Sequence, residues 1–415
     1  MGGGVLPRGA GQFAAEAASF RPPCRDRERQ RMSASVARRE AIILSCEYPP
    51  FPGGTGSYAG NLVEQLRAAG VRTTAIVPDY PDLPQRPAPD THRILRHHKI
   101  APATALKVLR LLMASPRSAV FLAADIRSVL LASLFSRLTG RPYRVMVHGS
   151  EAIKFKRKSL MRTIVRAAYC RSEMVSTNSA ATLAIFEDSF GHVPQGKVNY
   201  LGVDEAWFAP PPETFENVAL AALPQDARIV VTVGRIEDRK GQLETVQLLA
   251  DAQARHGVEG LVYIVAGRVE SDDYADQVKA AAAAAGVRLI LTGRLSDEDI
   301  RLLYKRALAH ILCARPLPTK IEGFGLVLVE AGAQHCPSIA SHVGGIPEVV
   351  GEDSPLLFAP EALGAMADAV AALARDPAWR AELGAAAFAR ARGFNWRACA
   401  EGTFPELLAP AGAGQ

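Results

Sequence analysis

The sequence lacks the long apolar runs, the paired cysteines and the biased composition that mark several classes of protein. None of its apolar runs approaches the roughly 20 residues that a membrane-spanning helix needs; one of the longest, residues 129–135, is short and is closely followed by Arg137. The six cysteines form no C-x-x-C pair, which argues against a zinc ribbon or a redox dithiol and favours reduced thiols. With 48% apolar and 22% charged residues, the chain has the composition of a globular protein, not of a disordered or fibrous one.

Charge is distributed unevenly along the chain. The first 210 residues contain 29 Lys and Arg against 16 Asp and Glu, whereas the remainder contains 19 against 26. A basic surface attracts nucleic acid, anionic membranes or phosphate-bearing substrates. The first half shows no aromatic-rich stacking platform and no known nucleic-acid motif, so we do not expect nucleic acid as a partner.

The length of 415 residues predicts two or three domains. Residues 1–38 mix Gly, Ala, Pro and Arg without apolar periodicity, and they lack the apolar centre of a secretion signal. We interpret this segment as a disordered tail or as a mis-assigned start, since Met32 is an alternative first residue.

Short apolar runs alternate with amphipathic stretches from residue 41 onward. In the first half, the runs that predict buried strands are residues 41–46, 73–77, 119–123, 143–147, 174–177 and 198–201. A helix is predicted over residues 57–69, where Leu62 and Leu66 share one face and Gly70 follows as a stop. Strands that alternate with helices are typical of parallel sheets.

This pattern breaks at residues 204–225, which are punctuated by prolines, and then restarts. In the second half the predicted strands are residues 229–233, 261–266, 287–291, 309–312 and 338–340. We therefore predict an α/β protein with two Rossmann-like domains, each a doubly wound parallel sheet, joined near residue 210.

The clearest chemical motif is EGFGLVLVE at residues 322–330. Its two carboxylates, Glu322 and Glu330, are eight residues apart, and its glycines suit a loop that enters a helix. A helix N-terminus presents unpaired N–H groups and the positive end of the dipole, so a diphosphate fits there. Glu322 would then lie beside the phosphates, near the sugar hydroxyls, and Glu330 two turns into the helix. The alternative is a helix-start carboxylate with an unrelated surface glutamate.

A second motif, GRIEDRKG at residues 234–241, follows the first predicted strand of the second half and carries Arg235 and Lys240. Loops beyond the carboxyl ends of parallel strands are where α/β folds bind ligands. Two cations there suit a diphosphate leaving group, whose developing charge they stabilise. An isolated pair of this kind is otherwise a solvated basic turn.

Together, at this order and spacing, the two motifs resemble the retaining glycosyltransferases of family four, which have the GT-B fold. The resemblance extends over most of residues 41–400. It implies an N-terminal acceptor domain (39–208) and a C-terminal donor domain (209–393) that face each other across a cleft, with residues 394–415 crossing back to the first domain. It also implies transfer of a hexose from a nucleotide-diphosphate sugar to an acceptor hydroxyl with retention of configuration, in envelope polysaccharide or glycolipid synthesis.

The resemblance further implies roles for single residues. Arg235 and Lys240 would bind the donor pyrophosphate, Glu322 the hydroxyls of the transferred sugar, and Glu330 the ribose hydroxyls. His148, in HGSE after the strand at 143–147, would lie near the transferred sugar and the acceptor, so His148 and Glu322 are the catalytic candidates. The other donor-binding candidates are Gly53 and Gly54 of an early glycine-rich loop, together with Gly323, Phe324, Gly325 and Leu326.

The family is metal-independent, and we expect neither a metal site nor a bound cofactor, since the nucleotide sugar is a co-substrate. The D-x-D pair Asp297 and Asp299 is a tempting counter-example. Because Ser296 precedes this pair and an apolar helical stretch follows it, helix capping explains the two carboxylates better.

From Lys154 to Arg171 the sequence contains seven basic residues and no acidic one. Leu160, Ile164 and Ala168 recur every four residues in this stretch. The pattern predicts an amphipathic cationic helix that is compatible with an anionic membrane surface. The alternative is a core-packed helix with a solvated basic face.

The expected partners are therefore a nucleotide sugar, a carbohydrate or lipid-linked acceptor and an anionic membrane surface. The expected location is the cytoplasm, with the inner face of the plasma membrane as a site of peripheral association. An isomerase of similar double-Rossmann shape, such as a sugar-nucleotide 2-epimerase, is the alternative function, because it uses the same diphosphate site without an acceptor.

Overall fold

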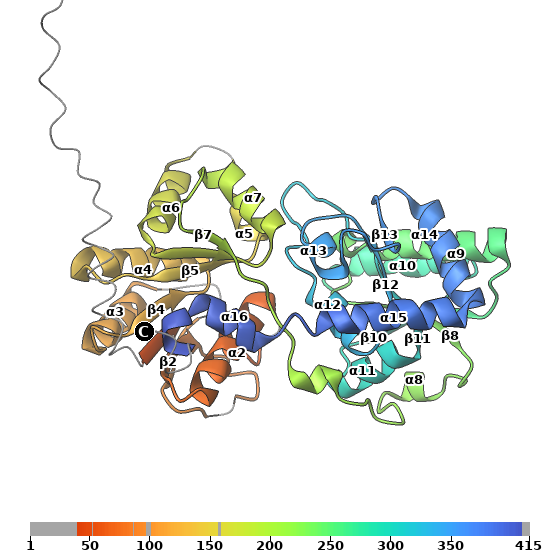
Figure 1. The fold of residues 1–415 in the computed structure, drawn as a ribbon, viewed down its shortest axis with the longest axis horizontal. Coiled ribbons are helices and arrows are strands. Elements are labelled where there is room, and N and C mark those ends of the chain that lie inside the picture. The colour runs from red at the N-terminus through yellow and green to blue at the C-terminus, as the bar shows by residue number, and fades with distance from the viewer. Residues whose placement is uncertain (1–39, 52, 86, 97–100, 157–158, 409–415) are drawn as a thin grey trace, which may run out of the picture. The chain divides into compact units, whose positions relative to one another are not determined.

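The computed structural model describes residues 40–51, 53–85, 87–96, 101–156 and 159–408. The segment predicted as a tail, residues 1–38, and Arg157 and Lys158 of the basic run lie outside this part. Two parallel sheets organise the described chain (Figure 1). Among the described residues, no helix combines the length and the apolarity that crossing a bilayer requires.

The first sheet has seven strands in the order β3-β2-β1-β4-β5-β6-β7, and all neighbours are parallel. The strands are β1 (Glu40–Leu44), β2 (Arg72–Pro78), β3 (Thr91–Leu95), β4 (Val120–Ala123), β5 (Arg144–Val147), β6 (Met174–Thr177) and β7 (Gly196–Val198). The apolar runs did not predict β3, because this edge strand is only partly buried and its sequence, THRIL, is half polar. The strand predicted at 198–201 lies slightly earlier, at β7.

The second sheet has six strands in the order β10-β9-β8-β11-β12-β13, again all parallel. They are β8 (Arg228–Val233), β9 (Leu261–Ala266), β10 (Arg288–Gly293), β11 (Ala307–Leu312), β12 (Ser338–Ser341) and β13 (Leu357–Phe358). The prediction of two doubly wound parallel sheets is confirmed. The central strands β8, β9 and β11 are almost fully buried, as their continuous apolar runs require.

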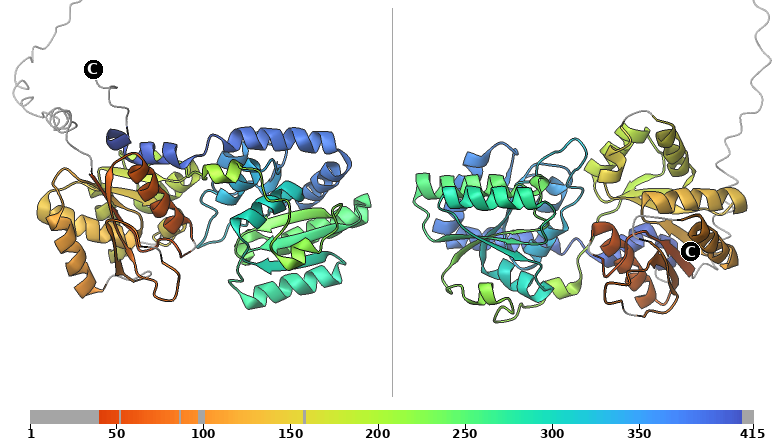
Figure 2. Two further views of the ribbon diagram at one scale, coloured as in Figure 1. Left: turned by 90° about the horizontal axis from the view of Figure 1, so that it is seen from below. Right: turned by 180° about the vertical axis from the view of Figure 1, so that it is seen from behind.

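Helices cover both faces of each sheet (Figures 1 and 2). Those of the first half are α2 (Gly54–Ala68), α3 (Pro102–Ala114), α4 (Ile126–Thr139), α5 (Ser150–Ile153), α6 (Leu160–Arg171) and α7 (Ala180–Phe190). Those that follow are α8 (Val218–Ala221), α9 (Gln242–His256), α10 (Asp272–Ala284), α11 (Asp297–Arg306), α12 (Leu326–Ala333), α13 (Ile346–Val350), α14 (Leu363–Arg375), α15 (Pro377–Ala391), α16 (Trp396–Thr403) and α17 (Pro405–Leu408). Helices α3, α4, α6 and α7 pack on one face of the first sheet, and α2 and α16 pack on the other.

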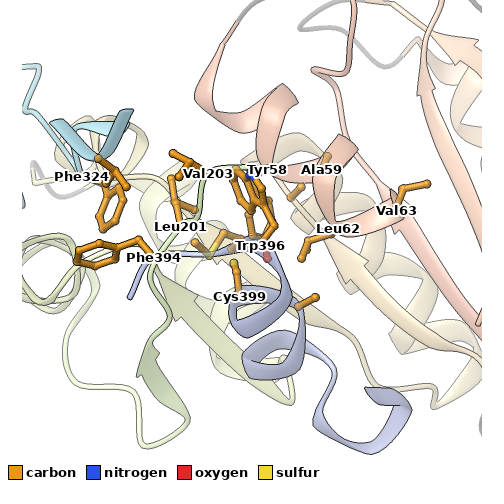
Figure 3. Close-up of a cluster of buried hydrophobic side chains, with 14 of the residues drawn as sticks. Tyr58, Ala59, Leu62, Val63, Leu201, Val203, Phe324, Phe394, Trp396 and Cys399 are labelled. Atoms are coloured by element: carbon orange, nitrogen blue, oxygen red, sulfur yellow. The ribbon is translucent and has the colours of Figure 1, made fainter. Parts of the chain in front are cut away.

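Helix α16, near the end of the chain, completes the core beside α2, which lies near its beginning. Trp396 and Cys399 of α16 lie against Tyr58 and Leu62 of α2 (Figure 3). The Tyr58 hydroxyl is 3.3 Å from Thr403 Oγ1, and burial of these apolar groups provides most of the adhesion. Since the described residues between 40 and 408 belong to a single compact unit, the domain boundaries expected at 209 and 394 stay predictions.

Candidate active site

The two sequence motifs leave neighbouring strands at the same edge of the second sheet. Strand β8 lies between β9 and β11, so the strand order reverses beside it. The GRIEDRKG loop follows β8, and the loop that carries Glu322 leads from β11 to α12. The crevice at such a reversal, beyond the carboxyl ends of the strands, is where open α/β sheets bind ligands.

Helix α12 begins without a side-chain cap. Gly325 precedes it in the left-handed region, with φ of 88°, a conformation that favours glycine. No acidic residue lies in the first turn, so no side chain there competes for the N–H groups of Leu326 and Val327. The start of α12 therefore presents backbone donors and the positive end of a helix dipole.

Glu322 lies directly before this helix and is paired with two cations. Its Oε2 atom accepts hydrogen bonds from Arg239 Nη1 at 2.7 Å and from Lys240 Nζ at 2.7 Å. All three residues are buried. Burial alone raises the pKa of a carboxyl, but the charges of Lys240 and Arg239 outweigh it and lower the pKa of Glu322 to about 2. Glu322 is therefore ionised throughout the physiological range.

A second buried carboxylate, Glu237, holds Arg239 from the other side and pairs with two further cations. It pairs with Arg239 at 3.0 Å, with Arg235 at 3.0 Å and with Lys320 at 3.0 Å. Burial opposes its ionisation, yet Arg239 and Lys320 lower the pKa of Glu237 below its usual value. Four cations thus share two buried carboxylates, which leaves an excess of positive charge beside α12.

The two predicted cations, Lys240 and Arg235, differ in how deeply they are buried. Lys240 lies in the buried cluster, whereas Arg235 lies at its rim with 41% of its side chain exposed and a second carboxylate, Glu270, at 3.7 Å. Arg239 also binds Glu322, a role that the motif by itself does not predict. The only signal for it was its place directly before Lys240 in the motif.

Glu330 lies further along α12, after its first turn, and is only partly buried. Burial, followed by the nearby charge of Asp297, raises the pKa of Glu330 to about 8. The two carboxylates of the EGFGLVLVE motif therefore differ in protonation at neutral pH: Glu322 is charged and Glu330 is largely neutral.

The remaining residues of the motif serve mainly as supports. Phe324 packs its ring against Tyr200 and Phe394, with centroid distances of 6.0 and 5.5 Å, so only its backbone remains for a ligand. Gly323 lies so close to the first half that an added Cβ would be 2.5 Å from the carbonyl oxygen of His148. Only glycine is tolerated at this approach.

His148 lies beside the Glu322 loop as a consequence of that approach. Its backbone N–H donates to Glu151 Oε1 at 2.5 Å, and its ring meets Tyr58 edge-on at 5.2 Å. Burial lowers its pKa below the usual range, so the imidazole is neutral. Among the described residues, the buried Nε2 of this ring has no hydrogen-bond partner.

The early glycine-rich loop forms the start of α2. Gly53 precedes the helix and Gly54 is its first residue, and no side chain caps this end. An added Cβ on Gly53 would be 3.0 Å from Glu47 Oε2, while nothing lies within 4 Å of one on Gly54. Burial raises the pKa of Glu47 to about 7, and Arg235 is among the charges that oppose the shift.

The turn GGIPE, residues 344–348, packs against the backbone of the Glu322 loop. Gly345 N donates to Glu322 O at 3.0 Å, and Gly344 has a φ of 59° that favours glycine. Glu348 then accepts the N–H groups of Ala180 and Ala181 at 2.8 and 3.0 Å, at the start of α7. This carboxylate supports the loop by joining α13 to the first half.

The acidic pair Asp297 and Asp299, in the first turn of α11, has a structural explanation. Ser296 caps the helix, and Asp299 accepts the backbone N–H groups of Glu216 and Asn217 at 2.8 and 3.0 Å. In the part of the chain that the structure describes, no group of three or more His, Cys, Asp or Glu side chains is arranged to hold a metal ion.

Comparisons with known sequence families match both halves of the chain. Residues 53–203 match the family described as Glycosyl transferase 4-like domain. Residues 215–390 match the family described as Glycosyl transferases group 1. The second match contains both the GRIEDRKG and the EGFGLVLVE motifs.

Similar curated proteins are glycosyltransferases too. The GDP-mannose-dependent alpha-(1-6)-phosphatidylinositol monomannoside mannosyltransferase of Mycobacterium tuberculosis is 28% identical over 367 residues, which cover 83% of this chain and 91% of that protein. The D-inositol 3-phosphate glycosyltransferase of Kineococcus radiotolerans is 32% identical over 222 residues, which cover 49% of each chain.

Solved structures share the fold. The sucrose-phosphate synthase of Thermosynechococcus elongatus superimposes with a TM-score of 0.70 at 22% identity, over 88% of this chain and 98% of that one. Anabaena HepE, solved in complex with UDP-glucose, superimposes with a TM-score of 0.69 at 18% identity, over 89% of this chain and 100% of that one. At these identities the likeness is one of fold.

The charge cluster generates a prediction about stability. Replacing Glu237 by Gln removes the buried charge that Arg235, Arg239 and Lys320 share, so we expect the free energy of unfolding to fall by about 2 kcal/mol or more in urea denaturation. Glu270→Gln is the control, because Glu270 is 36% exposed and its pairs are solvated; it should cost less than about 0.5 kcal/mol. Equal effects of the two variants would contradict the central place of Glu237.

Proposed function

Because the chain is a glycosyltransferase, with a 4-like domain followed by a group 1 domain, we propose that it moves a hexose from a nucleotide-diphosphate sugar to an acceptor hydroxyl with retention of configuration. The observation that carries the site is the pairing of Glu322 with Arg239 and Lys240 at the start of α12. The matched families and the relatives named above are glycosyltransferases, and nothing supports the alternative of a 2-epimerase.

The proposed reaction breaks the bond between the anomeric carbon and the diphosphate oxygen and forms one from that carbon to the acceptor oxygen. The acceptor hydroxyl gives its proton to the departing diphosphate oxygen, and the products are the glycoside and the nucleoside diphosphate. Negative charge grows on the leaving diphosphate in the transition state. Lys240, Arg235 and the backbone donors of α12 are fixed beside the proposed diphosphate position, so they stabilise that charge without reorganisation.

Glu322 has two tasks in this proposal. Its Oε2 atom holds Lys240 and Arg239 in place. Within the described residues no hydrogen bond ends on its Oε1 atom, which is therefore available to accept a hydroxyl of the transferred sugar. His148, with its neutral ring and unpartnered Nε2, approaches the same loop from the first half and would contact the sugar or the acceptor.

GDP-mannose is the first donor to test, and a lipid-linked acceptor the first acceptor class. The Mycobacterium tuberculosis relative is named for GDP-mannose and for a phosphatidylinositol mannoside, while HepE was solved with UDP-glucose. UDP-glucose is therefore the second donor to test. A role in glycolipid or envelope polysaccharide synthesis would follow from such an acceptor, with the small soluble acceptor as the alternative.

We also propose that the stretch from Lys154 to Arg171 contacts an anionic membrane, with the protein peripheral on the cytoplasmic face. Helix α6 buries Val165, Ala168 and Tyr169 but leaves Leu160, Met161 and Ile164 exposed. The spacing of Leu160, Ile164 and Ala168 predicts one shared helix face, but of these three only Ala168 is buried. Exposed apolar groups at the start of a cationic helix are typical of membrane surfaces.

The proposed chemistry needs no metal ion, because Lys240, Arg235 and the start of α12 supply the positive charge. We expect transfer from GDP-mannose to continue in EDTA at the rate measured without it. The control adds Mg²⁺ after chelation and measures product release separately. A requirement for Mg²⁺ or Mn²⁺ in the transfer step itself would contradict the proposal.

Removal of the diphosphate cations should lower the rate of transfer. Lys240→Ala and Arg235→Ala each remove one charge facing the leaving group, and a loss of ~3 kcal/mol corresponds to about a hundredfold fall in kcat/KM. Arg315→Ala is a matched control, because Arg315 is half-exposed and pairs with Glu244 outside the cluster. Near-normal turnover of both site variants would refute the assignment.

The raised pKa of Glu330 predicts that donor binding depends on pH. A carboxylate that accepts the ribose hydroxyls must be ionised, whereas Glu330 is largely protonated below its pKa of about 8. Binding of GDP should therefore release a proton, and its affinity should rise by up to about tenfold per pH unit between pH 6.5 and about 8. Calorimetry in buffers of different ionisation enthalpy measures this release. The Glu330→Gln variant is the control for titration of the nucleotide phosphates. If the affinity for GDP depends on pH in this variant as it does in the wild type, Glu330 does not bind the ribose.

A further inference from the structure

Three helices of the first half lie side by side over one face of the first sheet. Helix α4 packs against α3 on one flank and α6 on the other, and all three contribute to one apolar core (Figure 1). Their inward sides are ordinary core surfaces. Their outward sides are unusual, and those of α3 and α4 play no part in the site or in the membrane contact proposed for α6.

The outward side of α3 contains only apolar and basic side chains. Val108 and Leu112 are buried, whereas Leu106 and Met113 are 51% and 63% exposed. The exposed positions follow one face of the helix: Ala103, Leu106, Lys107, Arg110, Met113 and Ala114. A solvent-facing helix normally carries acidic and neutral polar residues on this side, and α3 has none there.

The outward side of α4 repeats this composition. Leu134 is 46% exposed and Leu138 is 68% exposed, and the other exposed side chains of the helix are Arg127 and Arg137. Residues 101–150 contain seven basic residues and a single acidic one, Asp125. The carboxylate of Asp125 caps α4, accepting the N–H groups of Arg127 and Ser128, so it is directed to the start of the helix and away from Leu134 and Leu138 near its end.

Arg141 joins the two helices into one surface. Its guanidinium donates to the carbonyl oxygens of Leu112 and Pro116 at the end of α3, at 3.0 and 2.6 Å. The same group lies over the ring of Phe135 in α4. The ends of the two helices, where Met113 and Leu138 are most exposed, are therefore held together.

We propose that the outward faces of α3 and α4 form a docking surface for an anionic lipid bilayer. In the described part of the chain, Lys107, Arg110 and Arg137 have no ion-pair partner, so their charges are available to lipid headgroups. Leucine and methionine between them gain free energy by entering the boundary between headgroups and acyl chains. The long basic side chains extend toward the phosphates from the same helix faces.

The composition of this face argues against a second copy of the chain or a nucleic acid as its binding partner. A symmetric contact between two copies would bring two cationic surfaces together, with no acidic group on the face to compensate. A nucleic acid would neutralise the charge but would leave the exposed leucines unused, and no aromatic side chain is exposed there for stacking. An anionic bilayer satisfies both the charge and the apolar groups.

This surface deepens the membrane contact proposed above and rests on that proposed function, although docking itself requires neither a donor nor catalysis. With α6 it makes a continuous layer of three helices, so the first half would rest on the membrane that holds a lipid-linked acceptor. The docking face and the α6 stretch are separable by substitution, since they share no residue.

Sedimentation of the full chain with vesicles tests the proposal. The wild type should sediment with phosphatidylcholine vesicles that contain phosphatidylglycerol, at low salt, and remain in solution with phosphatidylcholine alone. The variant Lys107→Gln/Arg110→Gln/Arg137→Gln should bind anionic vesicles about tenfold more weakly or worse. Leu106→Gln/Met113→Gln/Leu138→Gln should also bind more weakly, and its binding should fade faster with added salt.

The control is Val218→Gln/Lys279→Gln, which changes an exposed apolar and an exposed basic residue of the second half; it should bind as the wild type does. GDP affinity, unchanged in every variant, reports intact folding and separates this result from a failure of the proposed function. Loss of binding only in Lys154→Gln/Lys156→Gln, or wild-type binding in both α3–α4 variants, would overturn the proposal. So would a dimer in light scattering that the α3–α4 variants convert to a monomer.

Discussion

The buried pairing of Glu322 with Arg239 and Lys240 is the interaction on which the arrangement of the site depends. Moving three charges out of water is costly, and the cost is offset only when each charge has a close partner. Here one carboxylate oxygen holds both cations at 2.7 Å, and Glu237 holds Arg239 from behind. The loops that follow β8 and β11 are thereby joined, and both are aligned with the start of α12.

The parallel sheets explain why these loops meet at all. In each half the strand order reverses beside the first strand, which opens a crevice at the carboxyl edge. Glycines then allow the close approaches that side chains would block: Gly323 meets the backbone of His148, and Gly345 bonds to Glu322 O. Glu348 adds a carboxylate at the start of α7. The precision of the site thus rests on backbone contacts as much as on the charged groups.

The structure shows where basic residues of the two halves lie. In the second half, basic residues gather in the buried cluster beside α12, where a diphosphate would be neutralised. In the first half, Lys107, Arg110, Arg127 and Arg137 lie on the exposed sides of α3 and α4, between leucine and methionine side chains. The same residue types thus serve two different surfaces, and burial distinguishes them: pairing with carboxylates inside, and absence of acidic neighbours outside.

The two parallel sheets could be predicted from the sequence, because continuous apolar runs such as those of β8 and β9 specify buried strands, and local motifs make Glu322 and Lys240 candidates for the site. The apolar runs did not predict edge strand β3, because a partly buried strand needs no such run. Tertiary contacts determine that Arg239 shares Glu322 with Lys240, that Glu237 supports Arg239, and that Leu160 and Ile164 face outward. These facts depend on which residues, distant in the chain, come within hydrogen-bond distance or leave a helix face uncovered. Such distances are set by packing between elements, and periodicity within one element does not encode them.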